Sequence, residues 1–482
     1  MGLEAFMGQD SNRDKVQRIF QRGVRVIYEE ALNFLVSDSL LIDKLLTMDT
    51  IPSEITSVFL HNLKNDTYVA KKDDIFQNNT KLDGQKYRAL KTYLNWDPVT
   101  PENFIAHFTY RYRALSQLLW KRPQMKNTIS ISQISRIKTR EELSIIGMVR
   151  SIRENNDGRR FLTVEDLSGT ITILIPTTIP ERGDIVCDEV IGIKGFAGRD
   201  GGILFANAVF FPEITPIVWP TGERPYAVFL SDLHVGSKKF MVELWERFIS
   251  WLKEHKEVKY VFIAGDIVDG VGMYYKQNEH LDIETVEEQM EAFAKYMKQI
   301  RHDVKIFVIS GNHDPNRDSE PQPVFPEVFS KPLKKIDNLE VYSNPSWIDV
   351  EGVMILMYHG TSFDGVIDAI ESIRNNAYHR PYLAQTQLLK KRHLSPIFGK
   401  NKIFPDKQDF MVINKVPHVF HTGHIHNVSL SSYKGVKLVS SGTFQNITDF
   451  QEKLGHEPTP GQFIVMNLSD GNSKIIDFSR IQ

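Results

Sequence analysis

Five short polar runs in the C-terminal half of this 482-residue chain carry residue types that bind divalent metal ions. They are Asp232-Leu233-His234, Gly265-Asp266-Ile267-Val268-Asp269, Gly311-Asn312-His313-Asp314, His359-Gly360 and His421-Thr422-Gly423-His424-Ile425-His426. Carboxylate, imidazole and amide ligands together suit manganese, iron or zinc better than calcium. A single carboxylate such as Asp266 can bridge two ions about 4 Å apart, so the chemistry indicated is metal-assisted hydrolysis.

Short apolar stretches with β-strand character stand directly before the runs. They span 227–231, 260–264, 306–310 and 353–358, and Val419-Phe420 precedes the last run. Loops at the carboxyl ends of neighbouring strands in an open α/β sheet converge on one crevice. Along an extended chain Asp232 and His234 point to the same side, as do His424 and His426. A lone histidine is more often a core or surface residue, but five such loops after five strands are not expected by chance.

The elements around these strands indicate an α/β layered domain over 216–482. Four prolines in 212–225 mark its beginning, and amphipathic helices are expected over 241–254 and 283–301. A mixed sheet is expected near its end.

The preceding segment, 127–215, changes to short strands separated by glycine turns. Five such strands in under a hundred residues are typical of a small OB-fold β-barrel. This segment is locally basic, with Arg150 and Arg153 among its charges, and its aromatic residues are few. Single-strand binding and a purely structural role both remain open.

The N-terminal part is predicted to be helical. An apolar stripe over 12–48 predicts a helix within an N-terminal helical domain, 1–70. The segment 71–126 is expected to hold a polar linker and a second helix that starts at Thr100-Pro101-Glu102. Basic residues along that helix, including Arg111 and Arg113, form either a solvated face or a nucleic-acid contact.

Bulk composition excludes several classes of protein. The chain is 41% hydrophobic and 24% charged, with a formal net charge of −2, which permits a local basic groove on a neutral protein. One cysteine excludes an intrachain disulfide and a cysteine-rich zinc site. No apolar run approaches 18 residues, so we expect no membrane span. The N-terminus lacks the basic segment followed by an apolar run that marks a secretory signal, so we expect a soluble intracellular protein.

The ordered set D-x-H, G-D-x-x-D, G-N-H-D, H-G and G-H-x-H resembles the calcineurin-like metallophosphoesterase superfamily over about 230–445. The resemblance implies one metal ion held by Asp232, His234, Asp266 and His426, and a second held by Asp266, Asn312, His359 and His424. It implies that His313 is no ligand but approaches the scissile phosphate, stabilising charge or protonating the leaving oxygen. Asp314 would orient His313 or cap the start of a helix. Asp269 would contact a ligand side chain without contacting a metal ion itself, or would be structural.

Three further segments narrow the resemblance. With the preceding barrel, residues 229–237, 378–396 and 416–424 are similar to the small subunits of archaeal family D DNA polymerases, over roughly 145–482. This implies a 3′→5′ exonuclease that uses two divalent ions, manganese above all or else iron, zinc or magnesium. It would proofread single-stranded 3′ ends of DNA for a separate large catalytic polymerase subunit, in the cytoplasm at the nucleoid. Lys390, Lys391 and Arg392 would contact DNA phosphates or form a solvated turn.

Two rival hypotheses remain. One is a non-catalytic assembly subunit, similar to the small subunits of eukaryotic replicative polymerases, which have lost metal ligands. The other is a free-standing phosphoesterase that acts on nucleotides or phosphoproteins. Every ligand position is kept in this sequence, which favours the nuclease.

Overall fold

The computed structural model describes residues 26–27, 54–55, 87–91, 93, 99–136, 142–198, 201–453 and 455–479. The chain forms two compact units, Met1–Gln77 and Asn78–Gln482. In the first unit, β1 (Val26–Ile27) pairs in parallel with β2 (Glu54–Ile55). The helix predicted over 12–48 is therefore wrong at β1. The prediction of a helical domain over 1–70 is also wrong at β2, and the other residues of that segment lie outside the described part of the chain. The predicted boundaries at 126 and 215 stay predictions.

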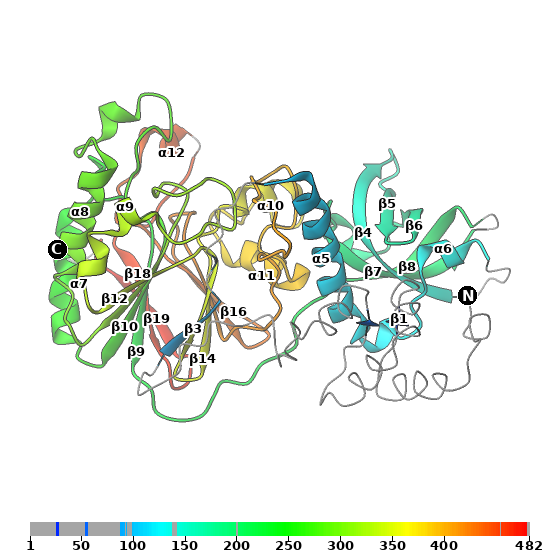
Figure 1. Ribbon diagram of the computed structural model, residues 1–482, viewed down its shortest axis with the longest axis horizontal. Helices are drawn as coiled ribbons and strands as arrows, with labels where there is room; N and C mark the ends of the chain where they lie inside the picture. Colours follow the sequence, from blue (N-terminus) through cyan, green and yellow to red (C-terminus); the bar gives the residue numbers. More distant parts are fainter. Residues whose placement is uncertain are drawn as a thin grey trace, which may run out of the picture. The chain divides into compact units, whose positions relative to one another are not determined.

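Two six-stranded sheets form the centre of the second unit (Figure 1). Sheet I has the order β12-β11-β10-β9-β18-β19, with β9 (Tyr226–Leu230), β10 (Val258–Ala264), β11 (Lys305–Ile309), β12 (Leu339–Tyr342), β18 (Gln462–Asn467) and β19 (Ser473–Asp477). Sheet II has the order β16-β17-β15-β14-β13-β3, with β3 (Tyr87–Lys91), β13 (Ser346–Val350), β14 (Val353–Met357), β15 (Val419–Thr422), β16 (Ser429–Tyr433) and β17 (Val436–Ser440). Strands β9 to β12 are parallel, whereas β18 runs antiparallel to β9.

The strands that precede the five polar runs are confirmed, but they belong to different sheets. Strands β9, β10 and β11 lie in sheet I, whereas β14 and β15 lie in sheet II. The expectation that they are neighbours in one open sheet is wrong. Strand β3 also falls in the segment 71–126, which therefore contributes a strand to sheet II besides the predicted helix. The predicted polar linker lies outside the described residues.

An aromatic core fills the space between the two sheets. Phe229, Phe262 and Phe307 stand in register on β9, β10 and β11. Their rings stack with centroids 5.2 Å apart for the first pair and 4.9 Å for the second. Residues of sheet II such as Ile355 and Val419 belong to the same buried cluster. Because side chains alternate along each strand, the residues between these point to the opposite face of sheet I.

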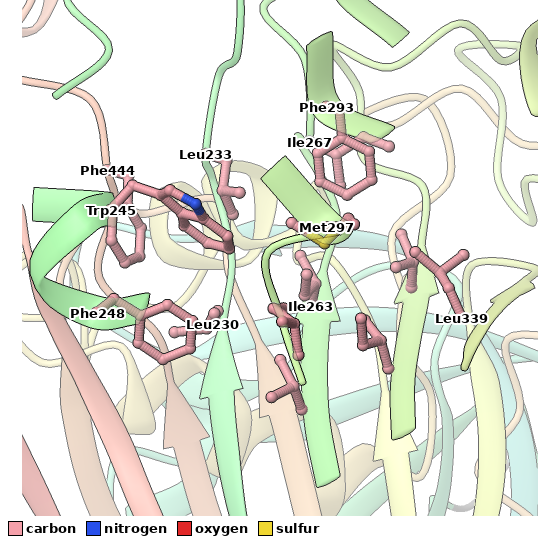
Figure 2. Close-up of a cluster of buried hydrophobic side chains, with 14 of the residues drawn as sticks. Leu230, Leu233, Trp245, Phe248, Ile263, Ile267, Phe293, Met297, Leu339 and Phe444 are labelled. Atoms are coloured by element: carbon pink, nitrogen blue, oxygen red, sulfur yellow. The ribbon is translucent and has the colours of Figure 1, made fainter. Parts of the chain in front are cut away.

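That opposite face is covered by two amphipathic helices. Helices α7 (Val242–Glu254) and α8 (Val286–Met297) confirm the two predicted helices. Figure 2 shows Trp245 and Phe248 from α7 beside Leu230 of β9, and Phe293 and Met297 from α8 near Ile267 and near Ile263 of β10. Removing these side chains from water is the main force that holds the helices on the sheet.

Two further helices pack on the outer face of sheet II. They are α10 (Phe363–Ala369) and α11 (Tyr382–Lys391). The buried amide of Gln385 in α11 donates to the carbonyl groups of Phe420 and Val439, so it ties the helix to β15 and β17. The shorter helices are α6 (Ile131–Ile134), α9 (Glu327–Ser330), α12 (Asp449–Lys453) and the 3₁₀ turns η2 (Pro123–Met125), η3 (Pro180–Asp184), η4 (Gln277–His280) and η5 (Leu333–Lys335).

The chain between α5 (Pro101–Trp120) and β9 forms a closed five-stranded barrel, as predicted. Its order is β4-β5-β6-β8-β7, with β4 (Glu142–Glu154), β5 (Arg160–Asp166), β6 (Gly169–Ile175), β7 (Val190–Ala197) and β8 (Ile203–Phe210). Strand β6 pairs in parallel with β8 and the other pairs are antiparallel. Alternate residues such as Leu162, Val164 and Ile173 fill the interior. The second unit is thus a mixed α/β structure with a separate barrel.

Helix α5 (Pro101–Trp120) begins where the sequence predicts, but one of its basic residues is not on a solvated face. Arg111 is 1% exposed and its Nε lies 2.6 Å from the Asp409 carboxylate. His107 and His393 approach the same carboxylate oxygen at 3.1 and 2.8 Å. Arg111 is therefore neither a solvated residue nor a nucleic-acid contact. None of the helices in the described ranges has the length and apolar character needed to span a bilayer.

The buried Asp409 cluster predicts an acid-sensitive stability. Burial, reinforced by the nearby Arg111 charge, lowers the pKa of His393 from 6.5 to about 4. Its neutral ring is satisfied at both nitrogens, because Nε2–H donates to Asp409 and Nδ1 accepts from the Ser395 amide. Between pH 6.5 and 4 this histidine is protonated in the unfolded chain but stays neutral in the folded protein. The free energy of unfolding therefore falls by up to about 3 kcal/mol as the pH is lowered over this range.

Urea unfolding at several pH values checks this, with His393→Gln as the comparison. The variant keeps an N–H donor near Asp409 but does not titrate, so it should lose about 3 kcal/mol less over this range. Equal pH dependence in the two proteins would contradict the prediction.

Candidate metal centre

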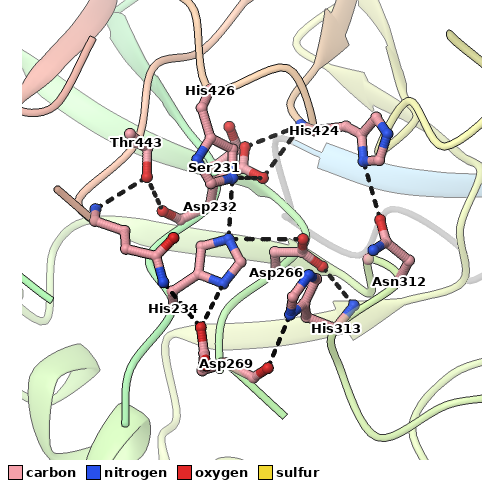
Figure 3. Close-up of polar contacts among 12 residues, drawn as sticks. Ser231, Asp232, His234, Asp266, Asp269, Asn312, His313, His424, His426 and Thr443 are labelled. Carbon is pink, nitrogen blue, oxygen red and sulfur yellow. Dashed lines mark hydrogen bonds and ion pairs between the residues drawn. The ribbon is translucent and has the colours of Figure 1, made fainter. Parts of the chain in front are cut away.

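All seven predicted ligands meet at the ends of strands from both sheets. Figure 3 shows six of them, Asp232, His234, Asp266, Asn312, His424 and His426. Asp232 and His234 follow β9, Asp266 follows β10 and Asn312 follows β11 in sheet I. His359 follows β14, and His424 and His426 follow β15 in sheet II. The facing sheets thus bring together residues up to 194 positions apart in the chain.

One group of donor atoms surrounds the imidazoles of His234 and His426. Their Nε2 atoms lie 3.0 Å apart. An Asp232 oxygen lies 3.3 Å from Nε2 of His426, and Asp266 Oδ2 lies 3.7 Å from Nε2 of His234. These four side chains are the set that the resemblance implies for one ion.

A second group lies around the amide of Asn312. Asn312 Oδ1 is 3.0 Å from His359 Nε2 and also 3.0 Å from His424 Nδ1. Oδ2 of Asp266 lies 3.3 Å from His359 Nε2, so the same carboxylate oxygen faces both groups. A ligand that bridges two ions would occupy this position.

The donor sets fit divalent cations. Neighbouring ligand atoms on one ion at about 2.1 Å stand about 3.0–3.4 Å apart, close to the separations in both groups. His234 gives its Nδ1–H to Asp269 Oδ1, at 3.1 Å, so its Nε2 is the ring nitrogen that faces His426. A cation or a proton shared by the two Nε2 atoms stabilises this arrangement. The mixture of oxygen and nitrogen donors suits manganese, iron or zinc.

The charges of the group members shift each other's pKa values. Burial works against ionisation of Asp266, but the neighbouring imidazoles, foremost His359, outweigh it and hold its pKa well below the usual range. Burial alone would lower the pKa of His359, yet the carboxylates of Asp266 and Asp232 raise it to about 10. The carboxylates are therefore ionised, and a cation that binds here displaces protons from the histidines.

The backbone at these residues is strained. Asp232, His234 and Asp266 have φ of 53°, 53° and 50°, and His424 and His426 have φ of 70° and 57°. They account for five of the eleven non-glycine residues with positive φ in the described part of the chain. The left-handed region costs a residue with a side chain about 1–2 kcal/mol and clusters at functional sites. Asp232 and His234 therefore reach the site from left-handed backbone, not through the extended alternation that the sequence suggested.

Close packing explains why residue 311 of the third motif is a glycine. A Cβ atom at Gly311 would stand 2.2 Å from Asp266 Oδ1 and 2.6 Å from the Asp266 amide nitrogen. The loop after β11 can thus approach the Asp266 carboxylate because residue 311 has no side chain.

Each imidazole is oriented by a second partner. The Nδ1–H of His359 donates to the Ala264 carbonyl at 2.7 Å. His424 Nε2 lies 2.9 Å from Asp364 Oδ2, and Asp364 Oδ1 accepts from the Tyr378 hydroxyl. Sequence reasoning missed Asp364, although it stands five residues after His359, because helix α10, which presents it to His424, has no motif of its own.

The contact between Asp364 and His424 leads to a graded prediction. Loss of an outer partner of a metal-binding histidine typically weakens metal binding 10- to 100-fold. Asp364→Asn should therefore raise the Mn²⁺ concentration needed for half-maximal binding by about that factor, measured by calorimetric titration. Asp368→Asn is the matched control, since Asp368 lies one turn further along α10 and pairs with Lys400 at the surface. Equal affinities in the two variants would exclude the role given to Asp364.

His313 lies beside the two groups, and Asp314 does not orient it. The Nδ1–H of His313 donates to the Asp269 carbonyl at 2.8 Å. Asp314 instead accepts the backbone N–H groups of Ile267 and Gly311, at 2.9 and 2.8 Å, and so joins two ligand loops. The next helix, α9, begins only at Glu327, so Asp314 caps no helix either. Both interpretations of Asp314, as the partner of His313 and as a helix cap, are wrong.

The two donor groups open into a cleft of about 540 Å³. Its wall includes ligands from both groups together with His313, Asp269 and Asp364. Two lysines, Lys238 and Lys239, lie at its edge. The metal groups are therefore accessible to a substrate with a negatively charged backbone.

Two of the predicted DNA contacts are buried and already paired. Lys391 is 1% exposed and its Nζ lies 2.7 Å from Glu189 of the barrel. Arg392 is 4% exposed and donates to the carbonyl groups of Ile413 and Asn414. Neither can reach a DNA phosphate, so these two predictions are wrong, and Lys390 is half-buried. Their charges connect α11 to the barrel and to the loop before β15.

The predicted contacts on the barrel are accessible. Arg150 and Arg153 are both exposed on β4. Arg150 has one carboxylate neighbour, Glu165, at 3.8 Å. They remain candidates for contact with a nucleic-acid backbone.

Comparison with known proteins assigns the family. Residues 227–428 match the family of B subunits of DNA polymerases alpha and epsilon. The DNA polymerase II small subunit of Methanothermobacter thermautotrophicus is 39% identical over 393 residues, covering 78% of this chain and 79% of that protein. The chain belongs to the family of DNA polymerase II small subunits. The resemblance to the small subunits of archaeal family D DNA polymerases is thereby confirmed.

Other members of this family are similar over the same share of the chain. The small subunit of Archaeoglobus fulgidus is 38% identical, covering 76% of this chain and 75% of that protein. The small subunit of Halobacterium salinarum is 36% identical, covering 78% and 75%. The matches therefore extend well beyond the five motifs and into the barrel and helices.

Proposed function

We propose that this DNA polymerase II small subunit is a 3′→5′ exonuclease that hydrolyses DNA phosphodiester bonds with two divalent metal ions. The main support is the pair of four-residue donor groups that share Oδ2 of Asp266 and open into one cleft. In this proposal Asp232, His234, Asp266 and His426 hold one ion. Asp266, Asn312, His359 and His424 hold the other, and manganese is the ion expected to support activity.

The protein's own residues contribute position and charge. The ions, when bound, supply Lewis acids that activate water and neutralise phosphate charge. The backbone N–H of His313 donates to Asp266 Oδ1 at 2.8 Å, which leaves Oδ2 directed at both donor groups. The His313 ring, fixed by the Asp269 carbonyl, stands in the cleft wall, where it stabilises the charge of the transition state or protonates the leaving oxygen.

DNA is the substrate that agrees with the family. A polymerase small subunit with an intact hydrolytic site would remove misincorporated nucleotides from the 3′ end of the growing strand. We propose that synthesis itself belongs to a separate large catalytic subunit. Arg150 and Arg153 of the barrel, with Lys390, would add sequence-independent attraction to DNA phosphates.

The test is hydrolysis of 5′-labelled single-stranded DNA by the purified full chain in Mn²⁺. A ladder that shortens from the 3′ end would support the proposal. Absence of hydrolysis with metal bound, both alone and with a large subunit added, would exclude DNA as substrate. Absence of bound metal would instead favour a non-catalytic assembly subunit.

A further inference from the structure

An exposed apolar loop stands at the rim of the metal cleft. The loop, residues 270–276, follows β10 and ends at η4. Val271, Met273, Tyr274 and Tyr275 in it are 45%, 38%, 40% and 88% exposed. They are four of the seventeen exposed large apolar side chains in the described part of the chain, gathered within five positions. Met273 and Tyr274 line the cleft itself.

The base of this loop is held firmly, although its tip is exposed. The buried amide of Gln277 donates to the carbonyl and carboxylate of Asp269 at 3.0 and 2.9 Å, and its oxygen accepts from the Met273 amide at 2.8 Å. Buried Gln289 accepts from the Gly270 amide at 2.9 Å. Asp269 in turn contacts His234 and His313, so the loop is fixed relative to the hydrolytic site.

One ring of the loop, that of Tyr274, is presented to the cleft beside positive charge, and the ring of Tyr275 next to it is exposed to solvent. The Tyr274 hydroxyl lies 3.1 Å from His280 Nδ1, which fixes its ring at the wall of the cleft. Lys238 and Lys239 line the same cleft, and the amine of Lys238 donates to the Glu279 carbonyl of η4. Aromatic faces next to lysines are the combination with which proteins bind single strands without reading their sequence.

We propose that the 270–276 loop is a stacking platform for unpaired bases at the 3′ end of the strand. Tyr274 takes the base nearest the metal groups and Tyr275 takes the next one, while Lys238 and Lys239 attract the phosphates. A base in a duplex is covered by its neighbours, so the platform favours an unpaired end. This inference rests on the proposed nuclease function and specifies the form of DNA that the site accepts.

Kinetics of the full chain in Mn²⁺ test the platform, with Tyr275→Ala and Tyr275→Phe compared with the wild type. The substrates are single-stranded oligothymidylate and the small diester bis(p-nitrophenyl) phosphate. Tyr275→Ala should raise KM for the oligonucleotide about tenfold, the typical effect of one lost base–aromatic stack. In Tyr275→Ala the ratio of oligonucleotide turnover to small-diester turnover should fall by the same factor. Tyr275→Phe keeps the ring, so it should have the wild-type KM and the wild-type ratio.

Two controls separate stacking from structure. Tyr275 is 88% exposed, so its replacement should leave the melting temperature unchanged. Val328→Ala removes a 61% exposed apolar side chain from α9, outside the cleft, and should leave KM for the oligonucleotide as in the wild type. Binding of fluorescein-labelled oligothymidylate, measured by anisotropy with Ca²⁺ in place of Mn²⁺, should weaken about tenfold in Tyr275→Ala alone.

The outcomes distinguish the platform from the nuclease. If Tyr275→Ala has the wild-type KM for DNA, the platform is refuted and the nuclease stands. If Tyr275→Ala and Tyr275→Phe are equally impaired, stacking is refuted. If wild type hydrolyses the small diester and not DNA, or neither, the proposed function fails and the platform fails with it.

Discussion

Asp266→Asn is expected to lower phosphodiester hydrolysis at least about a thousandfold and to remove one or both metal ions. Oδ2 of Asp266 faces His234 in one donor group and His359 in the other. Oδ1 accepts the His313 amide N–H at 2.8 Å. An asparagine must keep its oxygen toward that N–H, so its NH₂ group turns toward both metal positions. Charge stabilisation by a metal ion is worth several kcal/mol, and about 4 kcal/mol is a factor of roughly a thousand in rate.

Metal content and turnover measured on the same preparation check this prediction. Elemental analysis should show about two ions per chain in the wild type and one or none in Asp266→Asn. Asp303→Asn is the matched control, because Asp303 is half-exposed, pairs with Lys259 and lies outside the cleft. An Asp266→Asn protein that keeps both ions and a rate within tenfold of the wild type would refute the bridging role.

The residue types and order of the site could be predicted from the sequence because each motif follows a strong strand signal. The apolar runs at β9, β10 and β11 are short, continuous and buried on both faces, so their ends are clear. The polar residues that follow could only lie at the carboxyl edge of a sheet. Chemistry and position therefore agreed without knowledge of the fold.

The way in which the residues meet could not be predicted. Nothing in the strand patterns showed that β14 and β15 belong to a second sheet that faces the first. The left-handed backbone at Asp232 and His424 depends on surrounding contacts, such as the His424 amide donating to the Asp232 carboxylate at 3.0 Å. Such a conformation is held by tertiary structure against local preference, so the local sequence does not encode it.

The roles of basic residues were the hardest to predict, because they depend on whether the side chain is exposed or buried. In the sequence, Lys391 and Arg111 have the pattern of surface charges. In the structure each is buried beside a carboxylate that lies far away in the chain, Glu189 for the first and Asp409 for the second. A buried charge is retained when a partner neutralises it, and that partner is visible only after folding.

His313→Ala is expected to lower the rate of DNA hydrolysis by about 10²–10⁴ while both metal ions stay bound. The contact of residue 313 with Asp266 is made by its backbone N–H, which alanine keeps. The ring's hydrogen bond goes to the Asp269 carbonyl, so its loss leaves the Asp269 carboxylate on His234. Catalysis and metal binding should therefore separate in this variant, in contrast to Asp266→Asn.

The size of the His313→Ala effect on two substrates distinguishes the roles open to the ring. If the imidazole protonates the leaving oxygen, the hydrolysis of DNA should slow far more than the hydrolysis of bis(p-nitrophenyl) phosphate, whose leaving group departs without a proton. If the ring only stabilises charge on the phosphoryl oxygens, both substrates should slow by the same factor. His456→Ala is the control, since His456 also lines the cleft but packs on Tyr378. Loss of metal from the His313→Ala protein would show that His313 is a metal ligand. Unchanged turnover would show that His313 has no part in the mechanism, because removing a ring that acts on the reacting phosphate must slow the reaction.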